Sequence, residues 1–323
     1  MKKIAVLMGG KSNEREVSLV SGKNVAEALA SLGKYEVVPV DLTEENLDPM
    51  PKDVDAAYIA LHGGWGESGG VQAALNALGI PYTGPGVAAS RIAMDKVKTK
   101  MVLEMKGVPT AAWSLANPDT PASPLPLPVV VKPPADGSSV GISKVSTPEE
   151  WAPALACAAA AMTNPGDQDR QTPARQDAKT LLVEEFVPGR EFTVGVIDGE
   201  ALPVIEIVAK GGWYGYEEKY NSDETRYPFL CDQPPNVQTP RHPDAASLES
   251  ELKSLAIKAY DAVGCRGVTR VDFRVSPLGR CYVLELNTSP GFTSHSLVPK
   301  AGMKTGLTFA GVCERILASA RCD

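Results

Sequence analysis

Acidic and amide side chains recur at a spacing of two residues near the C-terminal end of the chain, within two hydrophobic runs. The runs are GVTRVDFRV (267–275) and RCYVLELNT (280–288), and SPLG separates them. Two apolar runs on either side of a turn segment that contains Pro and Gly predict a β-hairpin. A four-residue loop would pair Val275 with Arg280, and this register decides which side chains share a face.

In that register Arg270 faces Glu285, and Asp272 faces Val283. Opposed residues share a face with residues two positions away, so Arg270, Asp272, Glu285 and Asn287 all point the same way. The carboxylates and the amide form an all-oxygen set that suits Mg²⁺ or Mn²⁺ rather than zinc. Because Mg²⁺ usually binds substrate phosphates as well, this face points to a nucleotide. The alternative is a solvated hairpin face, and a loop one residue longer or shorter would break the arrangement.

A second segment has the residue types of a phosphate site. VVVKPPADGSSVGISKV (129–145) places Lys132 at the end of an apolar strand, before a loop of small residues. Small residues let backbone N–H groups approach phosphate oxygens, and the lysine supplies charge. An ordinary hairpin turn is the alternative. In LLVEEFVPGREFTV (181–194), the backbone at 185–187 could contact an adenine edge, and Glu191 could accept from ribose hydroxyls.

The string A-x-x-x-x-G-K-S at 5–12 is close to a P-loop, but its first glycine is replaced by Ala5, inside a strand. Glu14 and Glu16 follow it and would repel phosphate. We therefore expect the Gly-Gly pair in this string to allow a tight turn or the close approach of a different ligand.

Alternating strands and helices position these segments. Strand-like runs at 4–8, 37–40 and 58–61, with a helix at about 16–32, predict a parallel βαβ sheet whose ligand loops lie at the carboxyl ends of its strands. Later elements are predicted as helices at 71–78, 88–106, 149–162, 244–263 and 307–319, and as strands at 129–132, 181–187, 191–197, 202–208, 268–275 and 281–286.

The composition limits the classes of function. The chain has 323 residues and a net charge of −7, which argues against nucleic-acid binding and suits a cytoplasmic protein with small-molecule ligands. Six cysteines form no C-x-x-C pair and three histidines complete no zinc pattern, so we expect reduced thiols. No apolar run reaches the roughly 18 residues of a membrane helix.

Together the motifs resemble the ATP-grasp fold, and specifically the D-alanine–D-alanine ligase family. The resemblance spans nearly the whole chain in the family's order. It rests on KIAVLMGGKSNEREVSLVSG, ALHGGWGESGGVQ, PYTGPGVAAS, MDKVKTK, VVKPPADGSSVGISKV, VEEFVPGREFTV, KYNSDETRY, GVTRVDFRV and LELNTSPGFTSHSLVPKA. One string departs from the family, because HGGWGESGG has Ser68 where Asp is usual, and we assign Ser68 no role.

The resemblance implies an α/β (α+β) ATP-grasp architecture of three domains. An N-terminal parallel βαβ domain that binds D-alanine would span residues 1–86, and two α+β domains, 87–183 and 184–323, would clasp ATP. The polar stretch 163–179 is interpreted as a variable insertion, and 210–227 as a lid loop. We expect a cytoplasmic homodimer with no nucleic-acid or membrane partner.

The resemblance also implies a reaction. The carboxylate of one D-alanine attacks the γ-phosphate of ATP, and the amine of a second D-alanine then displaces phosphate from the acyl phosphate, giving D-alanyl-D-alanine for peptidoglycan precursors. Two Mg²⁺ or Mn²⁺ ions would be held by Asp272, Glu285 and Asn287. Because the acyl phosphate would hydrolyse in water, a closing lid is required.

By resemblance, one set of residues binds ATP: Lys96 and Lys132 at the α- and β-phosphates, Lys219 at the γ-phosphate, Glu184, Glu185 and Val187 at adenine, and Glu191 at ribose. A second set serves the amino acids: Glu14 and His62 at the first D-alanine, Arg270 and the N–H of Gly291 at the oxyanion, Ser296 and the N–H of Leu297 at the second carboxylate, and Ser138 and Tyr220 between the central loop and the lid. A tyrosine at 220 goes with amide rather than ester formation. We expect His295 to brace its loop.

Two other interpretations stay open. The chain could be another ATP-grasp carboxylate–amine ligase, such as a biotin-carboxylase-like enzyme, although SPGFTSHS supplies a carboxylate clamp that such an enzyme would not need. It could also be a non-catalytic nucleotide sensor, which would have no need for an oxyanion arginine such as Arg270 beside metal ligands.

Overall fold

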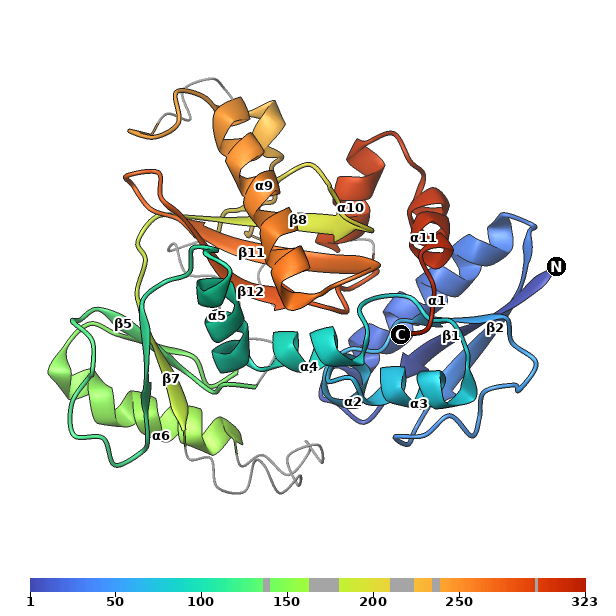
Figure 1. Cartoon of the computed structure of the whole chain (residues 1–323), viewed down its shortest axis with the longest axis horizontal. Helices are drawn as coiled ribbons and strands as arrows, with labels where there is room; N and C mark the ends of the chain where they lie inside the picture. Colours follow the sequence, from blue (N-terminus) through green and yellow to red (C-terminus); the bar gives the residue numbers. More distant parts are fainter. Residues whose placement is uncertain (136–139, 163–179, 210–223, 234–238, 294–295) are drawn as a thin grey trace.

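The computed structural model describes residues 1–135, 140–162, 180–209, 224–233, 239–293 and 296–323. Within these residues the strands form three sheets, an N-terminal, a central and a C-terminal one, each with helices packed on it (Figure 1). None of the described helices is long and apolar enough to cross a membrane. The predicted insertion at 163–179 lies outside the described residues.

The N-terminal sheet is parallel, with strand order β2-β1-β3. This order confirms the predicted βαβ alternation, and Leu7, Leu29 and Tyr58 are fully buried in its core. Since parallel strands end at one edge, the loops after β1 and β3 bring Glu14 and His62 to the same side. The elements are β1 (Lys2–Gly9), α1 (Arg15–Ser31), β2 (Tyr35–Leu42), β3 (Ala56–Ile59), α2 (Gly64–Glu67) and α3 (Gly70–Leu78).

The single helix predicted over 88–106 is wrong, because the segment forms α4 (Val87–Met94) and α5 (Lys96–Met105). The two helices are divided at Asp95, whose backbone is extended. The Asp95 side chain accepts a hydrogen bond of 3.1 Å from the N–H of Lys98 and thereby caps α5. Apolar periodicity continues across this break, so only the capping aspartate could have revealed it.

The central sheet is antiparallel, with order β4-β7-β5-β6, and α6 packs against it through a core that includes Val131, Leu155 and Val183. Two short strands, β4 and β6, were not predicted, since neither is long enough to show a clear period. The elements are β4 (Trp113–Ala116), β5 (Val129–Lys132), β6 (Ser143–Val145), the 3₁₀ turn η1 (Pro148–Glu150), α6 (Trp151–Met162) and β7 (Leu181–Glu185).

The C-terminal sheet has strand order β10-β8-β11-β12, with β9 also paired to β8. Helix α9 packs on one face, where Phe273 is buried, whereas α10 contributes Val298 to the core at the other face, beside Ile197. Helix α10 was not predicted. The elements are β8 (Arg190–Ile197), β9 (Glu200–Ala201), β10 (Ile205–Ile207), η4 (Leu230–Asp232), α9 (Ala245–Val263), β11 (Val268–Val275), β12 (Cys281–Asn287), α10 (Leu297–Lys304) and α11 (Phe309–Ala318).

The predicted register of the β11–β12 hairpin is wrong by one residue at the loop. Val275 pairs with Cys281 rather than with Arg280. Continued without interruption, this register would place Glu285 opposite Val271, on the face that packs against α9. The carboxylate would then be buried in the apolar core.

A β-bulge corrects the face. The register shifts between Asp272 and Phe273, which leaves Leu284 as the extra residue of β12 and sets Asp272 opposite Glu285. Arg270 consequently lies opposite Asn287, not opposite Glu285 as predicted. The loop and the bulge each displace the pairing by one residue, so that Asp272 lies opposite Glu285 instead of Val283. A displacement of two residues keeps every side chain on its face, so the four predicted polar residues still share one face.

Candidate active site

The polar face of the C-terminal sheet is built around Asp272, which is only 6% exposed. Its carboxylate accepts hydrogen bonds from Thr193 Oγ1 at 2.6 Å and from Arg270 Nε and Nη2 at 2.9 and 2.8 Å. Thr193 is the residue opposite Asp272 on β8, so the contact follows from strand pairing. A buried carboxylate is thus held in place by a neutral and a cationic donor. No motif or spacing in the sequence marks Thr193 as a site residue.

Glu285 and Asn287 complete this face. Lys96 Nζ lies 3.8 Å from Glu285 Oε2, so the break before α5 brings a lysine from outside the sheet to the carboxylates. Asn287 Oδ1 accepts a hydrogen bond of 2.9 Å from the N–H of Ser289. The donor chemistry therefore fits a hard divalent cation, because Asp272, Glu285 and Asn287 offer only oxygen ligands on adjacent strand positions.

The central sheet contributes a buried group of charges. Lys132 Nζ lies 2.8 Å and Lys100 Nζ 3.4 Å from Oε1 of Glu184. Burial alone would raise the pKa of Glu184, but the two ammonium groups outweigh burial, and the pKa is lowered. Lys132 and Glu184 were predicted to serve one nucleotide, and the structure brings them together. Lys100 was missed, because one lysine in a helix resembles any solvated one.

The segment after β7 was predicted to contact adenine and ribose. The Val187 carbonyl accepts a hydrogen bond of 3.2 Å from Arg274 Nε, and Arg274 Nη1 lies 3.3 Å from Glu191 Oε2. The ring of Phe186 lies 4.0 Å from Lys144 Nζ and 5.5 Å from the Arg274 guanidinium carbon. Arg274 thus joins the predicted adenine and ribose segments, although the sequence interpretation did not include it. Glu185 is exposed at the end of β7, and its N–H donates to the Ala112 carbonyl at 2.8 Å.

Glu14 lies directly before α1, against the loop after β3. A Cβ placed on Gly63 would come within 2.7 Å of Glu14 Oε2, and Gly63 has a φ of +65°. Both the space and the backbone conformation therefore require glycine at this position. The glycines of HGGWGESGG let the loop approach the carboxylate closely.

His62 is 5% exposed and links the N-terminal sheet to the segment after β12. Its Nδ1 lies 3.0 Å from the Ser289 carbonyl, and its Nε2 lies 2.9 Å from Ser21 Oγ. Since a carbonyl only accepts, Nδ1 carries the proton and Nε2 accepts from the Ser21 hydroxyl. Burial lowers the pKa of His62, with Glu14 opposing this, so the ring is neutral.

Glu67 is a site residue that the sequence interpretation missed. Burial, supported by the charge of Glu14, raises its pKa to about 8, although the Gly63 N–H and Arg270 oppose this. The Glu67 carboxyl group therefore interacts electrostatically with both Glu14, at the predicted D-alanine site, and Arg270, the predicted oxyanion arginine. Its position beside Ser68 in HGGWGESGG was the available signal, since the family string already marked this loop.

Gly291 and Ser296 face one another in the segment after β12. A Cβ on Gly291 would lie 2.9 Å from Ser296 Oγ, and this hydroxyl also accepts a hydrogen bond of 2.9 Å from the N–H of Thr293. Ser296 is the N-cap residue of α10, and Leu297 is its first helical residue. A helix N-terminus favours a carboxylate, so this corner has the polarity expected of a carboxylate site.

Four predicted residues lie outside the described residues: Ser138, Lys219, Tyr220 and His295. Of the predicted lid at 210–227, the structure describes only 224–227. These assignments stay predictions from the sequence.

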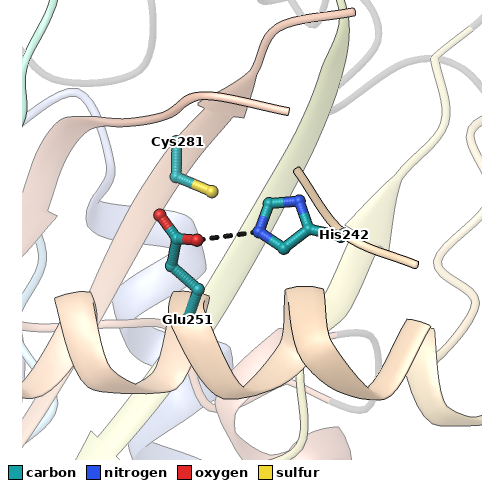
Figure 2. Close-up of side chains that lie close together, drawn as sticks. All are labelled: His242, Glu251 and Cys281. Atoms are coloured by element: carbon teal, nitrogen blue, oxygen red, sulfur yellow. Dashed lines mark hydrogen bonds and ion pairs between the residues drawn. The ribbon is translucent and has the colours of Figure 1, made fainter. Parts of the chain in front are cut away.

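A separate cluster of ligand-type side chains lies on the α9 face of the sheet. Figure 2 shows His242, Glu251 and Cys281 pointing toward one another, with His242 Nε2 at 2.8 Å from Glu251 Oε2. His242 Nδ1 lies 3.0 Å from Thr239 Oγ1. Burial, with the charge of Glu251 adding to it, raises the pKa of Cys281 to about 12, so the sulfur is a thiol. Because these groups already hydrogen-bond to one another, we interpret the cluster as an anchor that holds 239–242 against α9.

Family models match most of the chain. The model described as D-ala D-ala ligase N-terminus matches residues 3–48, and the model described as D-ala D-ala ligase C-terminus matches 101–166 and 168–318.

Known proteins agree with these matches. The chain is 42% identical to the D-alanine–D-alanine ligase of Glaesserella parasuis, over 98% of this chain and 97% of that protein. It is 43% identical to the enzyme of Bordetella pertussis, over 99% and 95%. The crystal structure of the D-alanine–D-alanine ligase from Bacillus anthracis complexed with ATP superposes with a TM-score of 0.77, at 29% identity, over 99% of this chain and 97% of that one. On its fold, its polar face and these similarities, the chain belongs to the D-alanine–D-alanine ligase family.

Proposed function

We propose that this chain joins two D-alanine molecules into D-alanyl-D-alanine with ATP, releasing ADP and phosphate, as a step in making peptidoglycan precursors. The observation that carries the proposal is the single polar face of Arg270, Asp272, Glu285 and Asn287, which lies beside the loops of Glu14 and His62. An ATP-dependent acyl transfer needs phosphate-directed and amino-acid-directed groups at one place, and here both meet.

ATP would bind between the central and C-terminal sheets. Lys96 and Lys132 each lie next to a carboxylate that a bound nucleotide would displace as their partner, Glu285 for Lys96 and Glu184 for Lys132. Glu184, with the backbone of Glu185 and Val187, would bind adenine. Glu191, already oriented by Arg274, would accept from ribose hydroxyls. Lys219 would meet the γ-phosphate.

Two Mg²⁺ or Mn²⁺ ions would be held by Asp272, Glu285 and Asn287 together with the phosphates of ATP. A divalent cation bound there would neutralise negative charge on the phosphate oxygens. Arg270 Nη2 lies 2.8 Å from Asp272 Oδ2 and neutralises the charge of this carboxylate. A cation on that carboxylate would let the Arg270 guanidinium donate to the oxyanion instead, so one arginine would serve both groups.

The first D-alanine would place its ammonium group at Glu14, with the neutral His62 beside it. As the second amine attacks the acyl carbon, negative charge develops on the carbonyl oxygen, where Arg270 and the N–H of Gly291 would stabilise it. Glycine at 291 is required for the close approach, because a side chain would collide with Ser296 Oγ. Preorganised donors of this kind bind the transition state more strongly than the ground state, and this difference lowers the barrier.

The second D-alanine would bind by its carboxylate at the start of α10, through the Ser296 hydroxyl and the Leu297 N–H. Ser138 and Tyr220 would connect the central loop to the lid and exclude water from the acyl phosphate. With tyrosine at 220 we expect an amide rather than an ester product.

We also propose the organisation in which this happens. Residues 1–86 would form the D-alanine-binding domain, and 87–183 and 184–323 the two domains that clasp ATP. We expect a homodimer in the cytoplasm, where ATP is supplied.

The proposal is tested by ADP release from Mg-ATP with three acceptors: D-alanine, L-alanine, and bicarbonate with biotin. Release that depends on D-alanine supports it. Release that depends on bicarbonate and biotin would favour the other ATP-grasp activity, and ATP binding without any ADP would indicate a nucleotide sensor.

A further inference from the structure

Lys100 is a buried lysine that lies beside the proposed adenine site and has no role in the function proposed above. It lies on α5 and is 1% exposed. Its ammonium group donates to Thr110 Oγ1 at 2.7 Å and to the Ala111 carbonyl at 3.2 Å, and lies 3.4 Å from Glu184 Oε1. Two of the three N–H donors of this lysine thus hydrogen-bond to protein oxygens, and the ammonium group forms an ion pair with Glu184. Full burial of a charged group is costly unless such partners are present.

Glu184 is the anion at the centre of this group. It is 2% exposed and lies opposite Val130 on β5. Lys132 is two residues after Val130, so its side chain and that of Glu184 lie on the same face of the sheet. Lys132 and Lys100 together place two positive charges on one carboxylate. If Lys132 turns to a phosphate, Lys100 is the cation that stays with Glu184, since its other two contacts are to protein groups of the 110–111 segment.

The same lysine is connected to the metal-binding strand. The Thr110 hydroxyl that accepts from Lys100 donates to the Val283 carbonyl at 2.9 Å, and the N–H of Val283 donates to the Pro109 carbonyl at 2.9 Å. Val283 is two residues before Glu285 on β12. Lys100 thus joins Glu184 of the central sheet to β12 of the C-terminal sheet, the two walls between which ATP would bind.

We infer that Lys100 is a positioning residue for the adenine of ATP, acting through Glu184. This inference rests on the nucleotide site proposed above. Lys100 keeps the Glu184 carboxylate ionised and holds it in an orientation in which the carboxylate accepts a hydrogen bond from the 6-amino group of the base. A base with a carbonyl oxygen at that position, as in inosine triphosphate, offers no donor and is repelled by the carboxylate.

The test is a calorimetric titration of the full chain with Mg-ATP and, separately, Mg-ITP, with no amino acid present. Lys100→Met removes the charge and keeps an unbranched side chain that is one atom shorter. We expect ATP to bind roughly ten-fold or more weakly, the size of one lost hydrogen bond to a charged group, and ITP to bind with little change. Lys98→Met is the matched control, because Lys98 is exposed on the same helix and its ammonium group lies 3.0 Å from Asp95 Oδ2, away from Glu184.

A double-mutant cycle with Glu184→Gln separates positioning from packing. The pair Lys100→Met and Glu184→Gln removes the Lys100 ammonium and its carboxylate partner together and leaves Lys132 as the charge of this group, so it stays informative if Lys100→Met alone fails to fold. If Lys100 acts through Glu184, adding Lys100→Met to Glu184→Gln changes neither the ATP affinity nor the preference for ATP over ITP. An additive further loss, or an unchanged preference in Lys100→Met, overturns the inference. Absence of ATP binding by the unaltered chain would overturn the proposed nucleotide site itself. Failure of the proposed function is thereby distinguished from failure of the role inferred for Lys100.

Discussion

Asp272 lies directly opposite Glu285 in the β11–β12 ladder, and the register shifts by one residue immediately beyond this pair. Two carboxylates that face each other repel, and in this fold the repulsion is offset by Arg270 at 2.8 Å from Asp272 and by Lys96 at 3.8 Å from Glu285. Each carboxylate is thus paired with a cation that belongs to the proposed reaction.

Replacing Glu285 with Gln should therefore affect the metal-bound protein far more than the metal-free one. Without metal, one of two opposed charges is removed and thermal stability should change little. With Mg-ADP the unaltered protein should be stabilised, and the variant should lose most of this stabilisation, since stabilisation follows ligand affinity. Thermal unfolding with and without Mg-ADP measures this. Glu200→Gln, an exposed strand residue paired with Arg315, is the control. An equal Mg-ADP shift in Glu285→Gln would remove Glu285 from the ligand set.

Replacing Arg270 with Ala should lower kcat by roughly 10²–10³-fold, the usual effect of losing an oxyanion donor. The substitution should also remove the two hydrogen bonds that Arg270 donates to Asp272, while the one from Thr193 stays. Because Asp272 is a proposed metal ligand, the dependence of the rate on Mg²⁺ should be measured in the same assay. Arg280→Ala, at the exposed end of the same hairpin, is the matched control. A near-normal kcat in Arg270→Ala would exclude Arg270 from the oxyanion role.

Replacing Glu67 with Gln should flatten the pH dependence of folding. Burial raises the pKa of Glu67 from its ordinary value of 4.5 to about 8, so the folded chain holds this proton more tightly than the unfolded chain does. The resulting stability is fully present below 4.5 and is lost as the pH rises through about 8.

Denaturant unfolding at several pH values between these limits, without ligands, gives the comparison. The free energy of unfolding should fall less with pH in Glu67→Gln than in the unaltered protein. Glu27→Gln, on the exposed side of α1, should leave the slope unchanged. Identical slopes for Glu67→Gln and the unaltered protein would show that Glu67 titrates normally.

Replacing Asp323 with Asn should loosen the junction of α3, α4 and the loop before β11. Asp323 Oδ2 accepts from the Val87 N–H at 2.8 Å and from Asn76 Nδ2 at 3.1 Å, and Oδ1 lies 3.2 Å from Arg266 Nη2. Since Arg266 is buried, we expect a loss of about 1–3 kcal/mol in the free energy of unfolding. Asp198→Asn, which removes an exposed pair with Arg321, should cost less than about 1 kcal/mol. Equal effects of the two substitutions would contradict this role of Asp323.

The fold was predictable where the sequence pattern is local. The parallel N-terminal sheet follows from apolar runs that alternate with a helix, and the long helix α9 follows from its period. The hairpin register was not predictable, because the loop conformation and the bulge at Leu284 depend on pairing rather than on apolar alternation. The shared face was nevertheless correct, since an even shift preserves it.

The candidate site was predictable in its motif residues and not in their partners. Asp272, Glu285 and Asn287 stand out by their spacing in the sequence. Thr193 contacts Asp272 through strand pairing, and Lys100 contacts Glu184 through helix packing. A single threonine in a strand, or a single lysine in a helix, carries no signal that separates it from its neighbours. Buried partners of this kind become visible only when the elements are placed in space.

The central claim is tested most directly by identifying the product. The purified chain, incubated with Mg-ATP and D-alanine, should form D-alanyl-D-alanine in amounts equal to the ADP and phosphate released, measured by mass spectrometry and by nucleotide chromatography. L-alanine should give neither product. ADP release without dipeptide, or dipeptide formed equally from L-alanine, would contradict the account.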